Sequence, residues 1–199
     1  MKLQAIKKCC NDYRRYILLN SPDGSQWISN GAAAWPVEDV KFTTEAIQAV
    51  FDIHGKKLEK TNIQEAETTD ERFQTVPLDG ETRLEDLGEV ISGGCIFRVL
   101  DSGAGVLVIN TDLEKPARRG EDELLYYLRL EEGRKPMVAV YADMFVSGMI
   151  QPITGKSAQQ LLDRLAKLGS HRARPITEDD LRPDEETGEQ MSMEGGGGQ

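Results

Sequence analysis

The amino-acid sequence predicts an α+β domain over residues 1–169, with a mostly antiparallel sheet covered by about three short helices, followed by a disordered acidic tail over residues 170–199. Two observations support the sheet. The predicted strands follow one another through short turns, without the strand–helix–strand units that build parallel sheets. The most apolar run, residues 135–154, is apolar at both odd and even positions, as expected of an interior strand covered on both faces.

The N-terminal residues are predicted to form strands and turns. Residues 2–7 alternate weakly between apolar and polar types and are expected to form an edge strand. Residues 16–20 and 26–29 are expected to pair as a hairpin, because the segment between them contains Pro and Gly, which favour turn torsions. Pro36 lacks an amide hydrogen, so we expect no central strand over residues 32–37.

Two helices are predicted in the middle of the chain. Residues 43–51 combine a capping threonine with an apolar side. Residues 82–91 begin with the capping-box spacing Thr82-Arg83-Leu84-Glu85. They also place apolar residues at helical intervals, namely Leu84, Leu87 and Ile91. Residues 54–75 between these helices are polar and predict an exposed helix or a long mobile loop.

The second half of the domain is predicted to be mainly strands. Residues 95–100 and 106–110 are expected to pair. Residues 123–130 suit a strand or a helix, and their alternation together with the following Gly133 favours a strand. The apolar run then folds on itself through a turn near Ala142-Asp143 and forms the central hairpin. The last predicted helix, residues 157–168, carries four leucines on one face and ends before Gly169.

Composition restricts the function classes. The net charge is −10, and residues 171–199 hold eight acids against three bases, so we expect neither direct nucleic-acid binding nor attraction to anionic membranes. The N-terminus lacks the apolar region of a signal peptide, and no apolar run is long enough to cross a bilayer. Three cysteines without framework spacing predict reduced thiols. These features together predict a cytoplasmic protein.

Two glycine motifs suggest nucleotide binding but do not meet its requirements. Gly155-Lys156-Ser157 resembles the end of a phosphate-binding P-loop, yet Ile150 stands where that loop needs a glycine. Turn formation at Gly155 with helix capping by Ser157 is the competing interpretation. Gly103-Ala104-Gly105 resembles the start of a dinucleotide fingerprint, but strand-like residues follow it instead of a helix. We therefore predict no cofactor.

The remaining candidates for chemistry are isolated in the sequence. His54 and His171 have no cysteine pair at zinc spacing, so no metal site is predicted. Cys10 and Cys95 are possible nucleophiles, but neither has a base suggested nearby. Basic residues flank two tyrosines near the N-terminus, a combination that can bind nucleic acid: Lys7, Lys8, Tyr13, Arg14, Arg15 and Tyr16. Within an acidic chain, this segment is interpreted as a solvated face, as are Arg118-Arg119-Gly120 and Arg172-Ala173-Arg174.

Two resemblances bear on function. The segments RRYILLNSPDGSQWISNG and AIQAVFDI resemble small uncharacterised proteins carried by bacterial phages and prophages. This resemblance implies a mobile-element protein in a bacterial cytoplasm and implies no site residues. Ile150-Gln151-Pro152-Ile153 is similar to the end of a late strand in DNA sliding clamps, although the chain shows no basic inner face.

Three functions remain open at this stage. The first is a non-catalytic binding or accessory protein that acts through protein contacts, since no titratable residues are seen to converge. The second is an acidic mimic that occupies a nucleic-acid-binding partner. A clamp-like factor of DNA metabolism is an alternative to this mimic. The third is a nucleotide-dependent enzyme that uses Lys156. The sequence favours the first, with no catalytic, cofactor or metal residues assigned.

Overall fold

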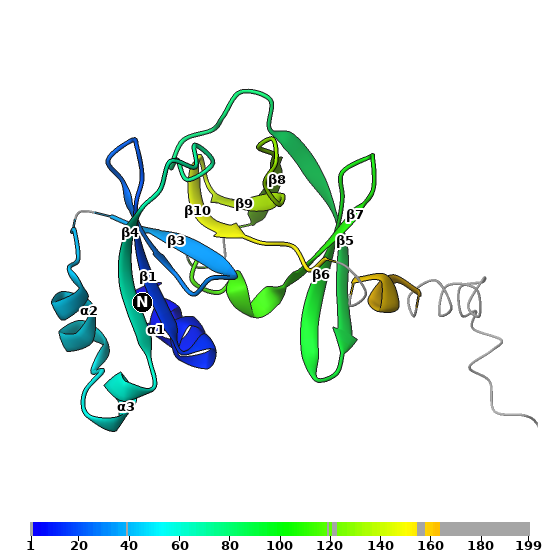
Figure 1. Cartoon of the computed structure of the whole chain (residues 1–199). Coiled ribbons are helices and arrows are strands. Elements are labelled where there is room, and N and C mark those ends of the chain that lie inside the picture. Colours follow the sequence, from blue (N-terminus) through cyan, green and yellow to red (C-terminus); the bar gives the residue numbers. More distant parts are fainter. Residues whose placement is uncertain (1, 39, 119, 121–122, 155–157, 164–199) are drawn as a thin grey trace, which may run out of the picture. The chain divides into compact units, whose positions relative to one another are not determined.

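The fold is known from a computed structural model, which describes residues 2–38, 40–118, 120, 123–154 and 158–163 (Figure 1). These residues form ten strands, three α-helices and a short 3-10 helix, and residues 158–163 are also helical. In chain order the elements are α1 (Lys2–Tyr13), β1 (Arg15–Asn20), β2 (Gln26–Ser29), β3 (Ala33–Val37), α2 (Thr44–Phe51), α3 (Lys56–Glu59), β4 (Asn62–Glu67), β5 (Thr82–Ser92), β6 (Cys95–Asp101), β7 (Val106–Asn110), η1 (Thr111–Leu113), β8 (Leu124–Arg129), β9 (Met137–Ala142) and β10 (Phe145–Ile150).

The strands form one mostly antiparallel sheet in the order β4-β1-β2-β3-β10-β9-β8-β5-β6-β7. The predicted α+β class is therefore confirmed. Within the described strands, the parallel contact is that between β1 and β4, where Arg15 lies opposite Asn62. The chain reaches β4 through α2 and α3, which supply the crossover that a parallel pair requires.

The sheet curls between β10 and β7. Strand β5 pairs with β8 over Thr82 to Leu84 and then leaves it to pair with β6 from Glu85 onward. After β10, the amide of Ile153 donates to the carbonyl of Val108 in β7, at 2.8 Å. The segment after β10 therefore lies beside β7, although four strands separate β10 from β7 in the sheet order, namely β9, β8, β5 and β6. Ile109 of β7 and Ile150 of β10 both belong to the larger core cluster.

The central hairpin is confirmed and is buried on both faces, as predicted. Val138 and Val140 of β9 face the larger core cluster, whereas Ala139 and Tyr141 face the smaller one. The turn lies one residue later than predicted, because Ala142 pairs with Phe145. Asp143 adopts a left-handed conformation there, with φ of 59°.

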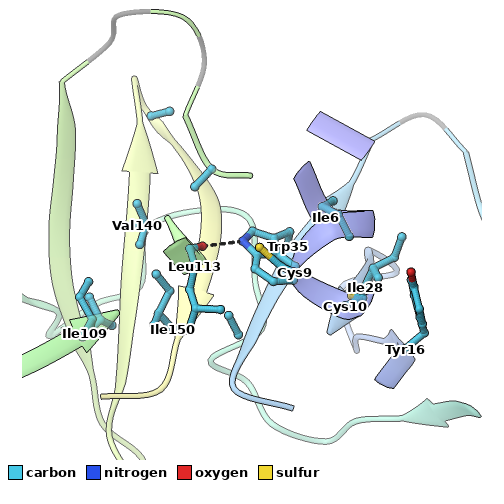
Figure 2. Packing of buried hydrophobic residues seen from close by; sticks show 14 of the residues in the cluster. Ile6, Cys9, Cys10, Tyr16, Ile28, Trp35, Ile109, Leu113, Val140 and Ile150 are labelled. Carbon is cyan, nitrogen blue, oxygen red and sulfur yellow. Dashed lines mark hydrogen bonds between the residues drawn. The ribbon is translucent and has the colours of Figure 1, made fainter. Parts of the chain in front are cut away.

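The larger cluster extends from helix α1, with Ile6 and Cys10, to the strands that carry Ile109, Val140 and Ile150 (Figure 2). Trp35 of β3 is fully buried in it and donates its indole N–H to the carbonyl of Leu113, at 3.1 Å. This bond ties the 3-10 helix to the first half of the sheet. The smaller cluster lies on the opposite face, around Trp27 and Met149, and is the one that concerns the candidate site.

Residues 2–7 are helical, so the predicted edge strand is wrong. The apolar side of α1 is formed by Ile6, Cys9 and Cys10, which are buried at helical spacing. The prediction considered only six residues, whereas this periodicity extends through Tyr13. Two apolar residues on one side of a six-residue window and one on the other do not distinguish a strand from a helix.

Residues 82–91 form strand β5, so the predicted helix is wrong. Of the apolar residues that suggested a helix face, Leu84 is buried, whereas Leu87 and Ile91 are exposed. The decisive signal is Gly93-Gly94, whose φ values of 60° and 79° suit the two-residue turn between Ser92 and Cys95. A Gly-Gly pair suits the end of a helix as well as a hairpin turn, and here it connects two strands.

Residues 33–37 form an interior strand despite Pro36, so that prediction is also wrong. Strand β10 pairs with β3 only at Ala33 and Ala34. Pro36 lies opposite Trp27 of β2 and beyond the end of the β10 pairing, so its missing amide hydrogen removes no bond on the β10 side. Strand β3 is therefore paired on both sides at Ala33 and Ala34, whereas at Pro36 it is paired with β2 alone.

The other predicted elements are largely confirmed. The hairpin around residues 21–25 is present, with Gly24 at φ of 81°. Helix α2 is present, with Thr43 accepting from the amide of Ala46. The predicted strands 95–100, 106–110 and 123–130 correspond to β6, β7 and β8. Residues 54–75 are neither one helix nor one loop, because they contain α3 and β4.

All described strands belong to one compact unit, residues 1–159. Within the predicted helix 157–168, residues 158–163 are helical, and the rest lie outside the described residues. The predicted tail from residue 170 also lies outside them. No helix in the described ranges has the length and apolar character to cross a bilayer.

Candidate functional site

Of the two glycine motifs, the structure describes Gly103-Ala104-Gly105. Gly103-Ala104-Gly105 lies in the turn between β6 and β7, where the amide of Ser102 donates to the carbonyl of Gly105 at 3.0 Å. Gly103 has φ of 76°, which a turn requires and a glycine supplies. The hairpin interpretation is therefore confirmed. Gly155-Lys156-Ser157 lies outside the described residues.

The thiols are dispersed. Cys9 and Cys10 are buried beneath α1, whereas Cys95 is exposed in the β5–β6 hairpin. Burial, assisted by Asp12 and Asp112, raises the pKa of Cys9 to about 11, and burial also raises the pKa of Cys10. Both thiols are therefore protonated at neutral pH and poorly suited to nucleophilic attack.

The described histidine also lacks partners for chemistry. His54 is exposed and lies 3.7 Å from Asp52 at the end of α2. No group of His, Cys, Asp and Glu suited to hold a metal ion occurs among the residues that the structure describes. His171 and Arg172-Ala173-Arg174 lie outside those residues.

The clearest built feature is a segment between β4 and β5, residues 70–81, which we call the strap. It crosses the smaller core cluster, where Phe73 packs edge-on against Trp27 with ring centroids 5.6 Å apart. Its backbone also joins the sheet, since the amide of Val146 in β10 donates to the carbonyl of Thr75 at 3.1 Å. The strap has no regular secondary structure, and side chains satisfy several of its polar backbone groups; the amide of Leu78, for example, donates to Glu81 at 3.1 Å.

Arg129 satisfies three of those backbone groups at once. Its guanidinium is almost completely buried and donates to the carbonyls of Arg72, Gln74 and Val76. Its Nε also pairs with the carboxylate of Glu81, at 2.5 Å. An arginine at the end of β8 therefore holds both the middle and the end of the strap. The planar, five-donor guanidinium is suited to this task, whereas a lysine ammonium is not.

A second buried arginine holds the start of the strap. Arg72 donates Nε and Nη2 to the two oxygens of Asp70, at 2.8 and 2.7 Å, and Nη1 to the carbonyl of Lys135. Burial alone would raise the pKa of Asp70, but the hydrogen bonds and charge of Arg72 outweigh it and lower that pKa. The ionised carboxylate is therefore part of the fold.

The strap and the β9–β10 turn together present an exposed apolar surface. We call it the strap face and define it by six residues: Val76, Pro77, Leu78, Tyr127, Met144 and Phe145. The side chains at the turn project into solvent, with Met144 76% exposed and Phe145 53% exposed. Large apolar side chains are rarely exposed side by side without a reason, so the surface is a candidate contact site.

Two hollows flank this turn. One has a volume of about 490 Å³ and is lined by Pro77, Leu78, Tyr127, Met144 and neighbouring residues. The other has a volume of about 370 Å³ and lies between Pro36, Thr75, Phe145 and Val146. The larger hollow has room for an aromatic side chain. Both are open to solvent and neither encloses a small molecule.

The larger hollow contains a hydrogen-bonded pair that could be mistaken for catalytic groups. Tyr141 donates its hydroxyl to Glu81 at 2.6 Å and accepts from Arg129 at 3.1 Å. Burial, with the hydrogen bond to Glu81, raises the pKa of Tyr141 to about 12, so the phenol stays protonated. The carboxylate of Glu81 is already engaged by Arg129. The group therefore holds the strap and has no free acid or base.

A second buried ionic network lies away from the strap. Arg98 of β6 pairs with Glu114, Asp86 and Glu89, at 2.7, 2.5 and 2.5 Å, and lies over the ring of Tyr126. The Glu114 side chain is completely buried and also lies 3.2 Å from Arg118. Every charge in this network is paired, which is what a buried structural network requires.

No protein family, curated protein or solved structure matches this chain. Function is therefore inferred from the geometry of the described residues.

Sequence reasoning missed the strap and the strap face. Residues 70–75 of the strap fall in the polar stretch that suggested an exposed helix or a long mobile loop, and residues 76–81 carried no prediction. Two signals were available: an arginine, Arg129, within an otherwise apolar strand, and an apolar pair, Met144-Phe145, within a hairpin turn. A buried charge requires a partner, and a turn does not normally need large apolar residues.

Proposed function

We propose that this chain is a non-catalytic accessory protein that binds a partner protein through the strap face. The observation that carries the proposal is the exposed pair Met144 and Phe145, presented between two hollows on a well-supported surface. Protein-binding surfaces commonly combine protruding apolar side chains with adjacent recesses. The three unbridged thiols fit a reducing compartment, so the proposed place of action is the cytoplasm.

The support beneath the surface favours binding. Arg129 and Arg72 hold the strap by hydrogen bonds to its backbone and to its acidic residues. A surface that is already ordered loses little conformational entropy when a partner binds. The same arginines leave no free acid–base pair in the larger hollow, which favours binding over catalysis.

Charge indicates the kind of partner. The larger hollow is lined by Asp79 and Asp143, both exposed, and by no lysine or arginine. Among the described ion pairs neither aspartate takes part, whereas Glu81 is neutralised by Arg129. The complementary ligand is a peptide segment with an aromatic side chain flanked by lysine or arginine. The aromatic ring would occupy the hollow and the cations would lie over Asp79 and Asp143.

Methyl NMR tests this proposal. The probe is a synthetic peptide with one tryptophan between two pairs of lysines, added to full-length protein labelled at its six methionine methyl groups. The Met144 signal, assigned with a Met144→Gln variant, is expected to shift and saturate. A peptide with glutamate in place of lysine serves as the matched control and is expected to bind at least tenfold more weakly.

Two results would overturn the proposal. One is an unchanged Met144 signal at millimolar lysine peptide. The other is equal binding of the lysine and glutamate peptides, which would remove the charge complementarity on which the choice of ligand depends.

A further inference from the structure

A cluster of basic residues surrounds the beginning of β1, although the chain as a whole is acidic. Residues 7–15 and 52–60 contain seven bases against three acids, a local net charge of +4 in a chain whose net charge is −10. We call the seven bases the basic ring: Lys7, Lys8, Arg14, Arg15, Lys56, Lys57 and Lys60. The second segment begins 37 positions after the first one ends, and the fold brings the two together.

Side-chain contacts connect one side of the ring. The hydroxyl of Tyr16 in β1 donates to the carbonyl of Lys7 in α1, at 3.2 Å. The Tyr16 ring packs against Phe51 at the end of α2, with centroids 5.4 Å apart. The ammonium of Lys57 donates to the carbonyl of Phe51, at 3.4 Å. A continuous path of contacts therefore joins α1, β1, α2 and α3.

Backbone contacts connect the other side. Lys57 accepts a hydrogen bond from the hydroxyl of Thr61, at 2.7 Å. The next residue, Asn62, donates its amide to the carbonyl of Arg14 at 3.0 Å and pairs with Arg15 in the sheet. Lys60 lies two residues before this pairing. The path thus returns to the end of α1, and the ring is closed.

The charges of the ring are available to a ligand. None of the seven bases forms an ion pair within the described residues, whereas Arg72, Arg98 and Arg129 are committed to buried carboxylates. Five of the seven are exposed, and Lys7 and Lys57 are partly buried. Unpaired, like-charged side chains in proximity repel one another, and a polyanion relieves that repulsion.

An exposed aromatic residue adjoins the ring. Tyr13 is 47% exposed and directly precedes Arg14 in the chain. Arginine binds phosphate through paired donors, and an exposed ring can stack on an unpaired base. We propose that the basic ring and Tyr13 bind single-stranded nucleic acid, which supplies both phosphates and unpaired bases. An acidic peptide would use the charges alone and leave Tyr13 without a role.

Fluorescence anisotropy tests this proposal, with labelled fifteen-residue oligothymidine as the probe and the full-length chain as the binder. Binding is expected at low salt and should weaken as salt increases. If four phosphates are neutralised, the plot of log affinity against log salt should have a slope of about −3, from roughly −0.7 per phosphate on single strands. The Arg14→Gln/Lys60→Gln double variant should reduce that slope by about 1.4.

A charge-matched variant provides the control. Lys41→Gln/Arg83→Gln also removes two exposed bases with no ion pair among the described residues, and is expected to keep the wild-type slope. Tyr13→Ser should weaken binding several-fold without changing the slope, and Tyr13→Phe should restore it. Thermal unfolding of each variant checks that the fold is retained.

Three outcomes would contradict the proposal. The first is an absence of binding at 50 mM salt. The second is an equal loss of slope in the control variant, which would indicate attraction spread over the surface. The third is a combination of two results: polyglutamate of matched charge displaces the oligonucleotide, and Tyr13→Ser has no effect on binding. Together they would indicate that the basic ring binds acidic protein segments.

Discussion

Replacing Arg129 with methionine should destabilise the protein strongly and release the strap. The change removes the hydrogen bonds to three strap carbonyls and leaves the Glu81 carboxylate, whose side chain is 7% exposed, without its cation. Breaking a buried ion pair by removing one partner costs about 3–5 kcal/mol. Because the carbonyls can regain water when the strap opens, we expect a loss of about 4 kcal/mol of unfolding free energy, within that range.

Chemical denaturation measures this loss, and hydrogen exchange locates it. The Arg129→Met variant should have a lower denaturation midpoint, and amides of strap residues should exchange faster than those of β9. Arg83→Met is the matched control, because Arg83 lies on β5, is exposed and forms no ion pair among the described residues. It should cost no more than about 0.5 kcal/mol. The reasoning fails if both variants lose the same stability, or if strap exchange in Arg129→Met is unchanged.

Three further predictions concern thiols, acid stability and packing. Native protein should react with a thiol reagent at Cys95 alone, and denatured protein at all three cysteines; fast native labelling of Cys9 would contradict the buried position of α1. Since the folded pKa of Asp70 lies below its ordinary value of 3.8, its ionised form stabilises the fold at neutral pH. Stability should therefore fall as pH decreases below about 4, and Asp70→Asn should be less stable at pH 7 and less sensitive to acid. Gly148→Ala should cost about 1–3 kcal/mol in thermal unfolding, because the added Cβ would lie 3.1 Å from Trp35 and 3.3 Å from Ala117, and a neutral effect would contradict this packing.

The sequence predicts the fold best where a pattern has a single explanation. The central hairpin is apolar on both faces of its strands and is interrupted at Asp143, a pattern that an interior strand pair joined by a turn explains. The 21–25 turn and the capping Thr43 are local signals whose cause lies within a few residues. These elements are present in the structure.

The sequence misleads where one pattern has two explanations. The spacing of Leu84, Leu87 and Ile91 suits a helix face, but Gly93-Gly94 also suits a hairpin, and pairing with β6 decides between them. Pro36 is incompatible with a position that is hydrogen-bonded to neighbouring strands on both sides. It fits strand β3 because β10 pairs with β3 only at Ala33 and Ala34. Both decisions depend on strand pairing, which involves residues remote in the sequence.

The candidate surfaces were the least predictable part. The strap face depends on Arg129 reaching across from β8, and the basic ring depends on Asn62, two residues after Lys60, bonding to Arg14. The net charge of the whole chain predicts no attraction to nucleic acid, and this stays a prediction. A total charge does not reveal where basic residues gather on the surface. The acidic-mimic, clamp-like and mobile-element interpretations stay predictions.

The most direct measurement of the central claim compares two pairs of exposed apolar side chains. Isothermal titration of the tryptophan–lysine peptide should be performed on the Met144→Ser/Phe145→Ser variant and on Ile91→Ser/Ile96→Ser, which removes an exposed pair from the β5–β6 hairpin. The first variant should lose at least tenfold in affinity, since truncating a central contact costs more than about 1.4 kcal/mol. The second should bind like the wild type. Equal affinities in the two variants would show that the strap face is not where the partner binds.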